Sequence, residues 1–350
     1  MPDGRLRELQ FLVGIRWRDM RRLLRRYRAD YTPRTLRRLG QIAWVAGLAR
    51  LAASTPADRS RPSSELQPVF IVGHWRSGTS ILQRLIACDR RFATPTFMDC
   101  TFPWQNGALA RWFVQGFSAK LPPTRGFDAF PLSPQAEFED EFALLKLTLE
   151  SPLLAYAFPR QSREIWRTCM EAPPSEEWRL ALRRVIEELA RRAPLQLLKS
   201  PAHAFRLATL AEAFPQARFI DIRREPGATF MSTCHLERHL LENNALQVDI
   251  QLDEAFVAQR MARHARAVDL AEGLPGNRFA RIAFDELIRR PRQTLDLLLE
   301  RLELGPYRPD ERRFVEIVRG FGGSVRERQV PEEARQLIKK AFEQAGARLQ

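Results

Sequence analysis

The residues best suited to chemistry lie in one short segment, VFIVGHWRSGTS, at positions 69–80. Gly73 and Gly78 have the spacing of a phosphate-binding G-x-x-x-x-G-K-[ST] loop, but Thr79 stands where that loop has its lysine. The backbone N–H groups of such a loop and the dipole of the helix after it favour a bound anion. The segment therefore predicts an oxyanion site that lacks the usual lysine.

The composition of the loop favours an anion with less charge than a nucleoside triphosphate. A triphosphate needs a lysine for its β- and γ-phosphates and an acid after a strand for Mg²⁺, and neither is found here. The cation inside the loop is Arg76. The remaining donors are backbone amides and hydroxyl groups, so we expect a site that works without a metal. These hydroxyls belong to Ser77, Thr79 and Ser80.

Strands and helices that could position this loop alternate along the chain. An apolar run at 69–72 reads as a buried strand, and apolar spacing at 79–88 reads as a helix. This alternation predicts an α/β fold with a P-loop-like parallel sheet flanked by helices. Later strands are expected at 195–198, 217–222 and 279–284, and later helices at 203–214, 227–241 and 291–302.

A second segment, FIDIRREPGATFMS at 219–232, completes a pattern with the loop. Arg224 ends a predicted strand, and Ser232 lies eight residues later on the predicted helix, so a guanidinium and a hydroxyl can reach one phosphate. The two segments resemble the sulfotransferases that use 3′-phosphoadenosine 5′-phosphosulfate. In that family the first segment commonly reads G-x-x-[RK]-[ST]-G-[ST]-[TS] and holds the 5′-phosphosulfate, and the second holds the 3′-phosphate.

Three further stretches resemble the bacterial branch of this family: LLKSPAH at 197–203, AFDEL at 283–287 and SPQAEFEDEFAL at 133–144. The resemblance runs from about Val69 to Leu304. The chain departs from the family pattern at Trp75, where proline is common, and at Asp99, where glutamate is common. Arg326 and Arg328 match a donor-binding loop only loosely.

The resemblance implies in-line transfer of a sulfuryl group to an acceptor hydroxyl or amine, with no metal. Catalysis of this kind rests on positioning and on charge stabilisation. The implied cofactor-binding residues are the loop from Gly73 through His74, Trp75, Arg76, Ser77, Gly78 and Thr79 to Ser80, together with Arg224 and Ser232. Lys199, at the end of a predicted strand, is expected to reach the transferring group. Its alternative is a solvated cation at a strand end.

A general base must accept the acceptor's proton, and several residues are candidates. Asp99, after the first predicted helix, is the first choice because it lies where related enzymes carry a carboxylate. The acidic group Glu139, Asp140 and Glu141 comes second, with an arginine-paired acidic helix face as its structural alternative. His203 and His74 follow, each with a structural or capping role as the alternative.

The chain divides into a basic helical extension at 1–60 and a sulfotransferase domain at 61–350 that contains a substrate-binding insertion at 94–174. A Ser- and Pro-rich segment at 54–68 reads as a linker. The insertion favours a hydrophobic alcohol or a lipid-linked acceptor, and a glycan or another small molecule is the alternative. Its aromatic residues include Phe97, Phe102, Trp104, Trp112, Phe113, Phe117, Phe127 and Phe130.

The positive charge gathers at the N-terminus. Residues 1–60 hold 14 Arg, no Lys and 5 acids, which gives 14 − 5 = +9 of the formal net charge of +14. Apolar residues on one face predict a basic amphipathic helix that docks on its own protein or lies on a membrane. Nucleic acid is disfavoured because no interleaved aromatic signature accompanies the charge. That face comprises Leu6, Leu9, Val13, Trp17, Met20, Leu24 and Tyr27.

The cysteines and the N-terminus indicate a cytoplasmic protein with possible contact to the membrane surface. The 4 cysteines form no C-x-x-C pair or zinc-ligand spacing and read as buried free thiols. Arg16, Arg18 and Asp19 interrupt any apolar signal core, and Arg50 interrupts the short run at 42–53. Two other function classes stay open: a kinase-like phosphotransferase with a degenerate loop, and a basic adaptor that binds membrane or nucleic acid.

Overall fold

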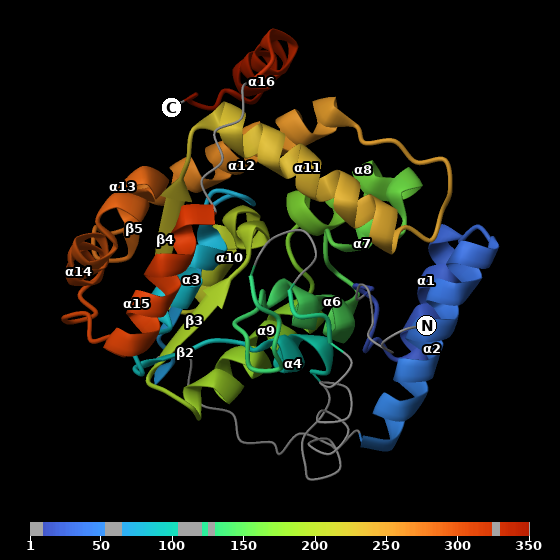
Figure 1. Ribbon diagram of the computed structural model, residues 1–350, viewed down its shortest axis with the longest axis horizontal. Coiled ribbons are helices and arrows are strands. Elements are labelled where there is room, and N and C mark those ends of the chain that lie inside the picture. The colour runs from blue at the N-terminus through green and yellow to red at the C-terminus, as the bar shows by residue number, and fades with distance from the viewer. Residues whose placement is uncertain (1–9, 53–64, 104–120, 125–129, 324–329, 350) are drawn as a thin grey trace. The chain divides into compact units, whose positions relative to one another are not determined.

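A computed structural model describes residues 10–52, 65–103, 121–124, 130–323 and 330–349 (Figure 1). The chain forms two compact units. The helical unit comprises Met1–Ser60, Pro95–Arg183 and Glu237–Leu252. The sheet unit comprises Arg61–Thr94, Arg184–Leu236 and Asp253–Gln350.

The sheet unit is built on 5 parallel strands in the order β2-β3-β1-β4-β5. The four strands expected from the sequence are all present, and the short β2 adds an edge. Helices flank the sheet, so the predicted α/β fold is confirmed (Figure 1). The strands are β1 (Pro68–Ile71), β2 (Phe92–Ala93), β3 (Leu195–Lys199), β4 (Arg218–Arg223) and β5 (Phe279–Ala283).

Strand β1 lies at the centre because it is apolar on both faces. All four of its residues are buried, and Phe70 stacks on Phe219 of β4 with ring centroids 5.5 Å apart. Burial of each large side chain contributes about 1.5–3 kcal/mol. β1 pairs with β3 on one side and with β4 on the other, so the ends of these three strands meet at one edge. In such sheets this edge is where ligands bind.

Helices of the sheet unit follow the strands closely. The helix expected at 203–214 begins as a 3₁₀ turn (η4, Pro201–Arg206), because Pro201 is the first residue of the turn and the Ser200 side chain caps it by accepting the Ala202 N–H. The other helices are α3 (Thr79–Ile86), α10 (Leu207–Ala213), α11 (Pro226–Asn244, which continues into the helical unit), α12 (Glu254–Asp269), η5 (Leu270–Gly273), α13 (Phe284–Arg289), α14 (Pro291–Arg301), α15 (Glu311–Arg319), η6 (Gly320–Gly323) and α16 (Glu332–Ala345).

The helical unit contains most of the aromatic insertion. Edge-to-face contacts join Phe97 to Phe138 at 5.1 Å and Phe11 to Phe142 at 4.8 Å between ring centroids. The predicted aromatic residues at 104, 112, 113, 117 and 127 lie outside the described residues. The elements of the unit are α1 (Trp17–Tyr27), α2 (Pro33–Ala52), α4 (Phe97–Thr101), α6 (Glu141–Thr148), α7 (Leu154–Ala157), η2 (Pro159–Gln161), α8 (Ser162–Trp166), a π-helical turn (Arg167–Glu171) and α9 (Glu176–Ala190, whose end belongs to the sheet unit).

The N-terminal helix is shorter than the apolar pattern predicted. It begins at Trp17, and residues 11–14 form a turn instead. Gly14 has a φ of +87°, which turns the chain out of a helical path. Only glycine fits there, because a Cβ would lie 1.9 Å from the Thr101 carbonyl oxygen. Residues 1–9, which hold the first part of the predicted face, lie outside the described residues.

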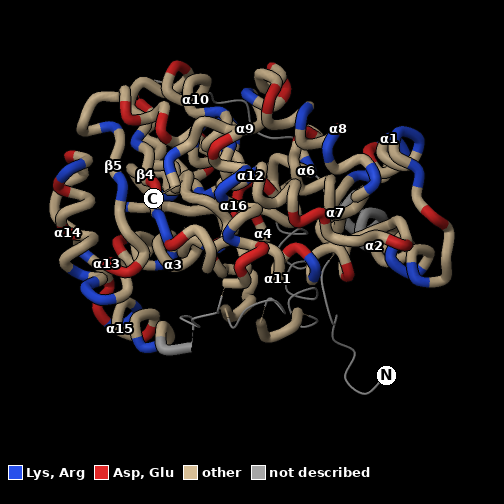
Figure 2. The backbone as a smooth tube through the Cα atoms, turned by 90° about the horizontal axis from the view of Figure 1, so that it is seen from above, with Lys and Arg blue, Asp and Glu red and all other residues tan. Residues whose placement is uncertain are grey.

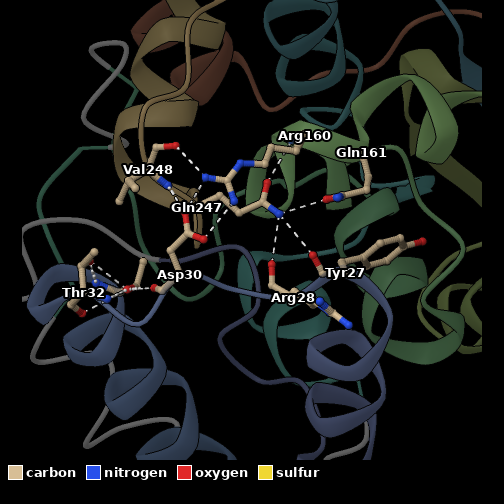
Figure 3. Close-up of polar contacts among 9 residues, drawn as sticks. Tyr27, Arg28, Asp30, Thr32, Arg160, Gln161, Gln247 and Val248 are labelled. Atoms are coloured by element: carbon tan, nitrogen blue, oxygen red, sulfur yellow. Dashed lines mark hydrogen bonds and ion pairs between the residues drawn. The ribbon is translucent and has the colours of Figure 1, made fainter.

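Helix α1 is docked on its own unit through a polar cluster at its C-terminal end (Figure 3). The Asp30 carboxylate accepts two hydrogen bonds from the Arg160 guanidinium, at 2.9 and 2.7 Å, and one from the Val248 N–H at 2.8 Å. Gln247 Nε2 donates to the carbonyl oxygens of Tyr27 and Arg28 at 3.2 and 3.1 Å. The docked interpretation of the amphipathic helix therefore describes α1. None of the described helices is long and apolar enough to cross a membrane.

Replacing Gly73 with alanine is expected to lower the free energy of unfolding by about 1–3 kcal/mol. The added Cβ would lie 2.7–3.0 Å from the side chain and backbone of Ile222, which a central strand holds in place. Gly273→Ala is the matched control, because no atom lies within 4 Å of a Cβ at that position. Urea unfolding checks both variants. Equal effects of the two substitutions would contradict the packing argument.

Candidate functional site

The loop after β1 has a left-handed backbone at two of its residues. Arg76 has a φ of +68° and Gly78, which caps α3, a φ of +104°. The Ser77 N–H and its Oγ both donate to the His74 carbonyl oxygen, at 3.2 and 2.7 Å. The turn is thereby closed on itself, and the first N–H groups of α3, which begins at Thr79, have no partners within their own helix.

Both loop glycines are required by protein packing. A Cβ on Gly78 would lie 2.5 Å from the Phe284 ring, and one on Gly73 would lie 2.8 Å from the Ile222 carbonyl oxygen. The sequence explains these glycines by the approach of an anion. The structure adds a second reason, because β4 and α13 leave no room for a side chain at either position.

The two predicted anion-binding segments meet at the end of the sheet. Arg76 Nε donates to Ser232 Oγ at 3.0 Å, and Arg224 Nη1 donates to the Arg76 carbonyl oxygen at 3.4 Å. The Arg224 guanidinium also lies 4.8 Å from the centroid of the Phe284 ring, a cation–π contact that holds it in place. Three residues far apart in the sequence thus lie side by side.

The neighbouring Arg223 forms ion pairs with two aspartates and does not face the loop. Its Nε donates to Asp221 Oδ2 at 2.9 Å, and its guanidinium also pairs with Asp269. Arg281 shares the same Asp221 oxygen at 2.8 Å. Of the two consecutive arginines, Arg224 is therefore the one that faces the loop, as the spacing to Ser232 predicts.

Lys199 and His203 lie on the neighbouring strand and the turn after it. Lys199 ends β3 opposite Ile71 of β1 and is buried. It is therefore not the solvated cation that was the alternative. His203 is fully buried, with its ring edge-to-face on Phe70 at 5.2 Å between centroids.

Two histidines support the loop from within the sheet unit. His264 of α12 donates from Nε2 to the Val72 carbonyl oxygen at 2.8 Å, and His74 donates from Nδ1 to the Trp75 carbonyl oxygen at 2.8 Å. The two rings stand edge-to-face at 5.1 Å. Desolvation lowers the pKa of His264 to about 4 and holds the pKa of His74 well below its usual range, where the nearby His264 lowers it further.

The carboxylate candidates belong to the helical unit. Asp99 is half-buried at the start of α4, where its Oδ2 accepts the Thr96 N–H at 2.9 Å and its own N–H donates to Thr96 Oγ1 at 3.2 Å. This reciprocal capping box explains why an acid stands there. Glu139, Asp140 and Glu141 are all buried.

Sequence analysis did not identify two residues that support the site, Phe284 and His264. Phe284 belongs to the AFDEL stretch, but its ring contact with Arg224 is long-range and no local spacing predicts it. His264 is a single histidine on an amphipathic helix and carries no motif. Arg326 and Arg328 lie outside the described residues.

Among the residues that the structure describes, no group of three or more His, Cys, Asp or Glu side chains could hold a metal ion.

A family comparison agrees with this geometry. The model of the sulfotransferase family matches residues 68–309, which include every element of the loop site. The chain belongs to the sulfotransferase family. Its relatives include the omega-hydroxy-beta-dihydromenaquinone-9 sulfotransferase Stf3 of Mycobacterium bovis, which is 34% identical over 247 residues. The aligned region covers 69% of this chain and 63% of the relative, so it spans less than two thirds of that protein.

Solved sulfotransferases share the fold. Sulfotransferase STF9 from Mycobacterium avium superposes with a TM-score of 0.64 at 16% identity, over 81% of this chain and 76% of that chain. Sulfotransferase STF1 from Mycobacterium tuberculosis gives a TM-score of 0.55 at 18% identity, over 90% of this chain and 83% of that chain. At these identities the comparison shows the common fold alone.

The two desolvated histidines behind the loop should make the folded state sensitive to acid. The pKa of His264 lies below that of an unfolded histidine, so the unfolded chain binds the proton first as the pH falls. The contribution of His264 is complete above about pH 6.5 and decreases towards about pH 4, by up to about 1.4 kcal/mol per pH unit, and His74 acts in the same direction. Urea unfolding at several pH values measures this slope.

His264→Gln is the informative variant, because its amide can still donate to Val72 but does not titrate. It should lose less stability than the wild type between about pH 6.5 and pH 4. His264→Phe, which removes the donor as well, should be destabilised at every pH. Identical slopes for the wild type and the glutamine variant would show that His264 does not cause the acid sensitivity.

Proposed function

We propose that this chain transfers a sulfuryl group from 3′-phosphoadenosine 5′-phosphosulfate to an acceptor hydroxyl or amine, without a metal. The observation that carries the proposal is the meeting of Arg76, Arg224 and Ser232 at the end of β1 and β4. A donor with a 3′-phosphate and a 5′-phosphosulfate needs two anion sites, and the two motifs provide one each. The kinase-like alternative accounts for the loop but not for Arg224 and Ser232.

The groups at this sheet edge fit such a donor. The amides of residues 76–80 and the Arg76 guanidinium would hold the 5′-phosphosulfate, with the hydroxyls of Thr79 and Ser80 beside them. Arg224 and Ser232 would hold the 3′-phosphate. Gly73, His74, Trp75, Ser77 and Gly78 shape the loop, and Ser77 does so by closing it through the His74 carbonyl oxygen.

The bound donor supplies a sulfuryl group whose bond to the 5′-phosphate oxygen breaks as a bond to the acceptor oxygen forms. Arg76 and the loop amides stabilise the negative charge that the departing phosphate gains. Lys199, one strand away from the loop, adds positive charge to the same edge of the sheet. The acceptor proton passes to a general base.

We assign the base to Asp99, with Glu141 as the second candidate and His203 as the third. Asp99 is half-buried and is the most exposed of the three. Glu141 and His203 are fully buried and would need a rearrangement before they could touch one. The capping role of Asp99 also fixes its side chain, which helps a positioned base.

We propose a hydroxyl on a hydrophobic or lipid-linked molecule as the acceptor. The mycobacterial relative is named for a hydroxylated menaquinone derivative, and the aromatic cluster around Phe97, Phe138 and Phe142 gives the insertion an apolar character. Buried free thiols at the four cysteines suit a reducing cytoplasmic compartment. A glycan acceptor would contradict this assignment without contradicting the donor.

Adenosine 3′,5′-bisphosphate is expected to bind in the presence of a chelator and to raise the melting temperature, and ATP should do so much less. Arg224→Ala should weaken binding of the bisphosphate by about 30-fold or more, because a charged hydrogen-bonded contact is lost. Binding of adenosine 5′-monophosphate, which lacks the 3′-phosphate, should change little. Isothermal titration calorimetry measures all three ligands.

Arg218→Ala is the matched control, since Arg218 begins β4 and Arg224 directly follows the other end of that strand. It should leave the preference for the 3′-phosphate intact. Absence of bisphosphate binding in the wild type would overturn the donor assignment. Tight binding of ATP that depends on Mg²⁺ would favour the kinase-like alternative.

Asp99→Asn should lower kcat by about 100-fold or more while bisphosphate affinity stays the same. The asparagine side chain can still accept the Thr96 N–H, so the capping box is kept while the base is removed. Glu141→Gln is tested beside it. Full activity in the asparagine variant, with a loss in the glutamine variant, would transfer the role to Glu141.

A further inference from the structure

Large apolar side chains are exposed on the two N-terminal helices. Trp17 is 53% exposed, Leu36 51%, Trp44 57% and Tyr31, in the link between the helices, 67%. These are four of the nine large hydrophobic side chains exposed in the described chain, and they fall within 28 residues. Isolated exposed hydrophobic residues are ordinary, whereas exposed apolar residues gathered on one surface mark an interaction site.

Helix α1 adds arginines to one side of this surface. Its apolar side, which includes Met20, Leu23 and Tyr27, is buried within the helical unit. Trp17, Arg21 and Arg25 follow one another at four-residue spacing on the opposite, exposed side. Of the apolar face predicted from the sequence, Val13, Met20 and Tyr27 are buried within the unit, whereas Trp17 is exposed.

Helix α2 repeats the arrangement. Thr35 and Ile42 are buried, and the Arg38 guanidinium donates to the carbonyl oxygens of Glu242 and Ala245. Leu36, Gly40 and Trp44 lie on the other side at four-residue spacing, with Arg37 beside them, and all four are exposed. α1 and α2 pack against each other and carry many basic residues (Figure 2).

We propose that the exposed sides of α1 and α2, together with Tyr31 in the link between them, form one N-terminal face that docks on an anionic lipid bilayer. This face comprises Trp17, Arg21, Arg25, Tyr31, Leu36, Arg37 and Trp44. Arginine forks pair with lipid phosphates, and tryptophan and tyrosine prefer the boundary between headgroups and acyl chains. The charge of residues 1–60, 14 Arg against 5 acids, is complementary to such a surface. Each arginine near an anionic leaflet multiplies partitioning by about fivefold.

The exposed apolar side chains of the N-terminal face favour a membrane over a nucleic acid. A nucleic acid duplex offers phosphates to the arginines, but its phosphate backbone gives Trp17, Leu36 and Trp44 no apolar surface to bury against. A bilayer accepts both kinds of side chain at once. The inference does not depend on the proposed sulfuryl transfer, since the donor loop belongs to the other unit.

Vesicle flotation of the full chain tests the proposal at physiological ionic strength. The chain should float with vesicles that contain phosphatidylglycerol, bind pure phosphatidylcholine vesicles far more weakly, and dissociate as salt is raised. Arg21→Gln, Arg25→Gln and Arg37→Gln together should lower binding to the anionic vesicles by about 100-fold. Trp17→Ser with Trp44→Ser should lower it by about tenfold or more.

Matched controls alter exposed arginines and exposed large apolar residues elsewhere. These are Arg184→Gln with Arg301→Gln and Arg312→Gln, and Leu270→Ser with Leu297→Ser, and both should bind like the wild type. Circular dichroism confirms that each variant is folded. Two results would overturn the proposal: no vesicle binding by the wild type, or equal losses in the control variants.

The same samples also test two other occupants of the face. Binding of duplex DNA or RNA that requires the three arginines, while vesicle binding does not, would assign the face to nucleic acid. A dimer in analytical ultracentrifugation that Trp17→Ser with Trp44→Ser dissociates would assign it to a second copy of the chain. Either result would replace the membrane as the partner.

Discussion

The close approach of β4 to the loop after β1 is the constraint on which the site depends. Gly73 has no side chain, so the Ile222 backbone can lie where a Cβ would stand. That contact places the end of β4 beside the loop and brings Arg224, two residues further on, to the Arg76 carbonyl oxygen. The first turns of α11 then deliver Ser232 to Arg76 Nε. Arg76, Arg224 and Ser232 meet because the backbone of β4 lies in contact with Gly73 at the start of the loop.

The surroundings of these donors keep their charges in place. Arg224 rests on the Phe284 ring, and Arg223 is neutralised by Asp221 and Asp269. Behind the loop, His264 and His74 stay neutral because desolvation disfavours their charged forms, and they use their N–H groups to hold loop carbonyls. The positive charge that faces the site is thus carried by Arg76 and Arg224, while the two histidines behind the loop are uncharged.

Local patterns explain which parts of this arrangement were predictable. The strands, the glycine loop and the spacing from Arg224 to Ser232 are short-range features, and a strand followed by a helix fixes where such residues point. The contacts of His264 and Phe284 could not be predicted, because each depends on a partner far away in the sequence. Within the described residues, the helix expected from Leu6 to Tyr27 begins only at Trp17, because the chain turns at Gly14, where Thr101 leaves no room for a side chain. The general base stays a prediction because its carboxylate candidates and the donor loop belong to different compact units.

Transfer of radioactive sulfur from labelled 3′-phosphoadenosine 5′-phosphosulfate to a pool of hydrophobic alcohols, in the presence of a chelator, tests the central claim most directly. The account predicts labelled product with the wild type, and a loss of at least about 100-fold when Arg76 is replaced by alanine. Absence of transfer under these conditions, together with phosphoryl transfer from ATP when Mg²⁺ is added, would contradict it.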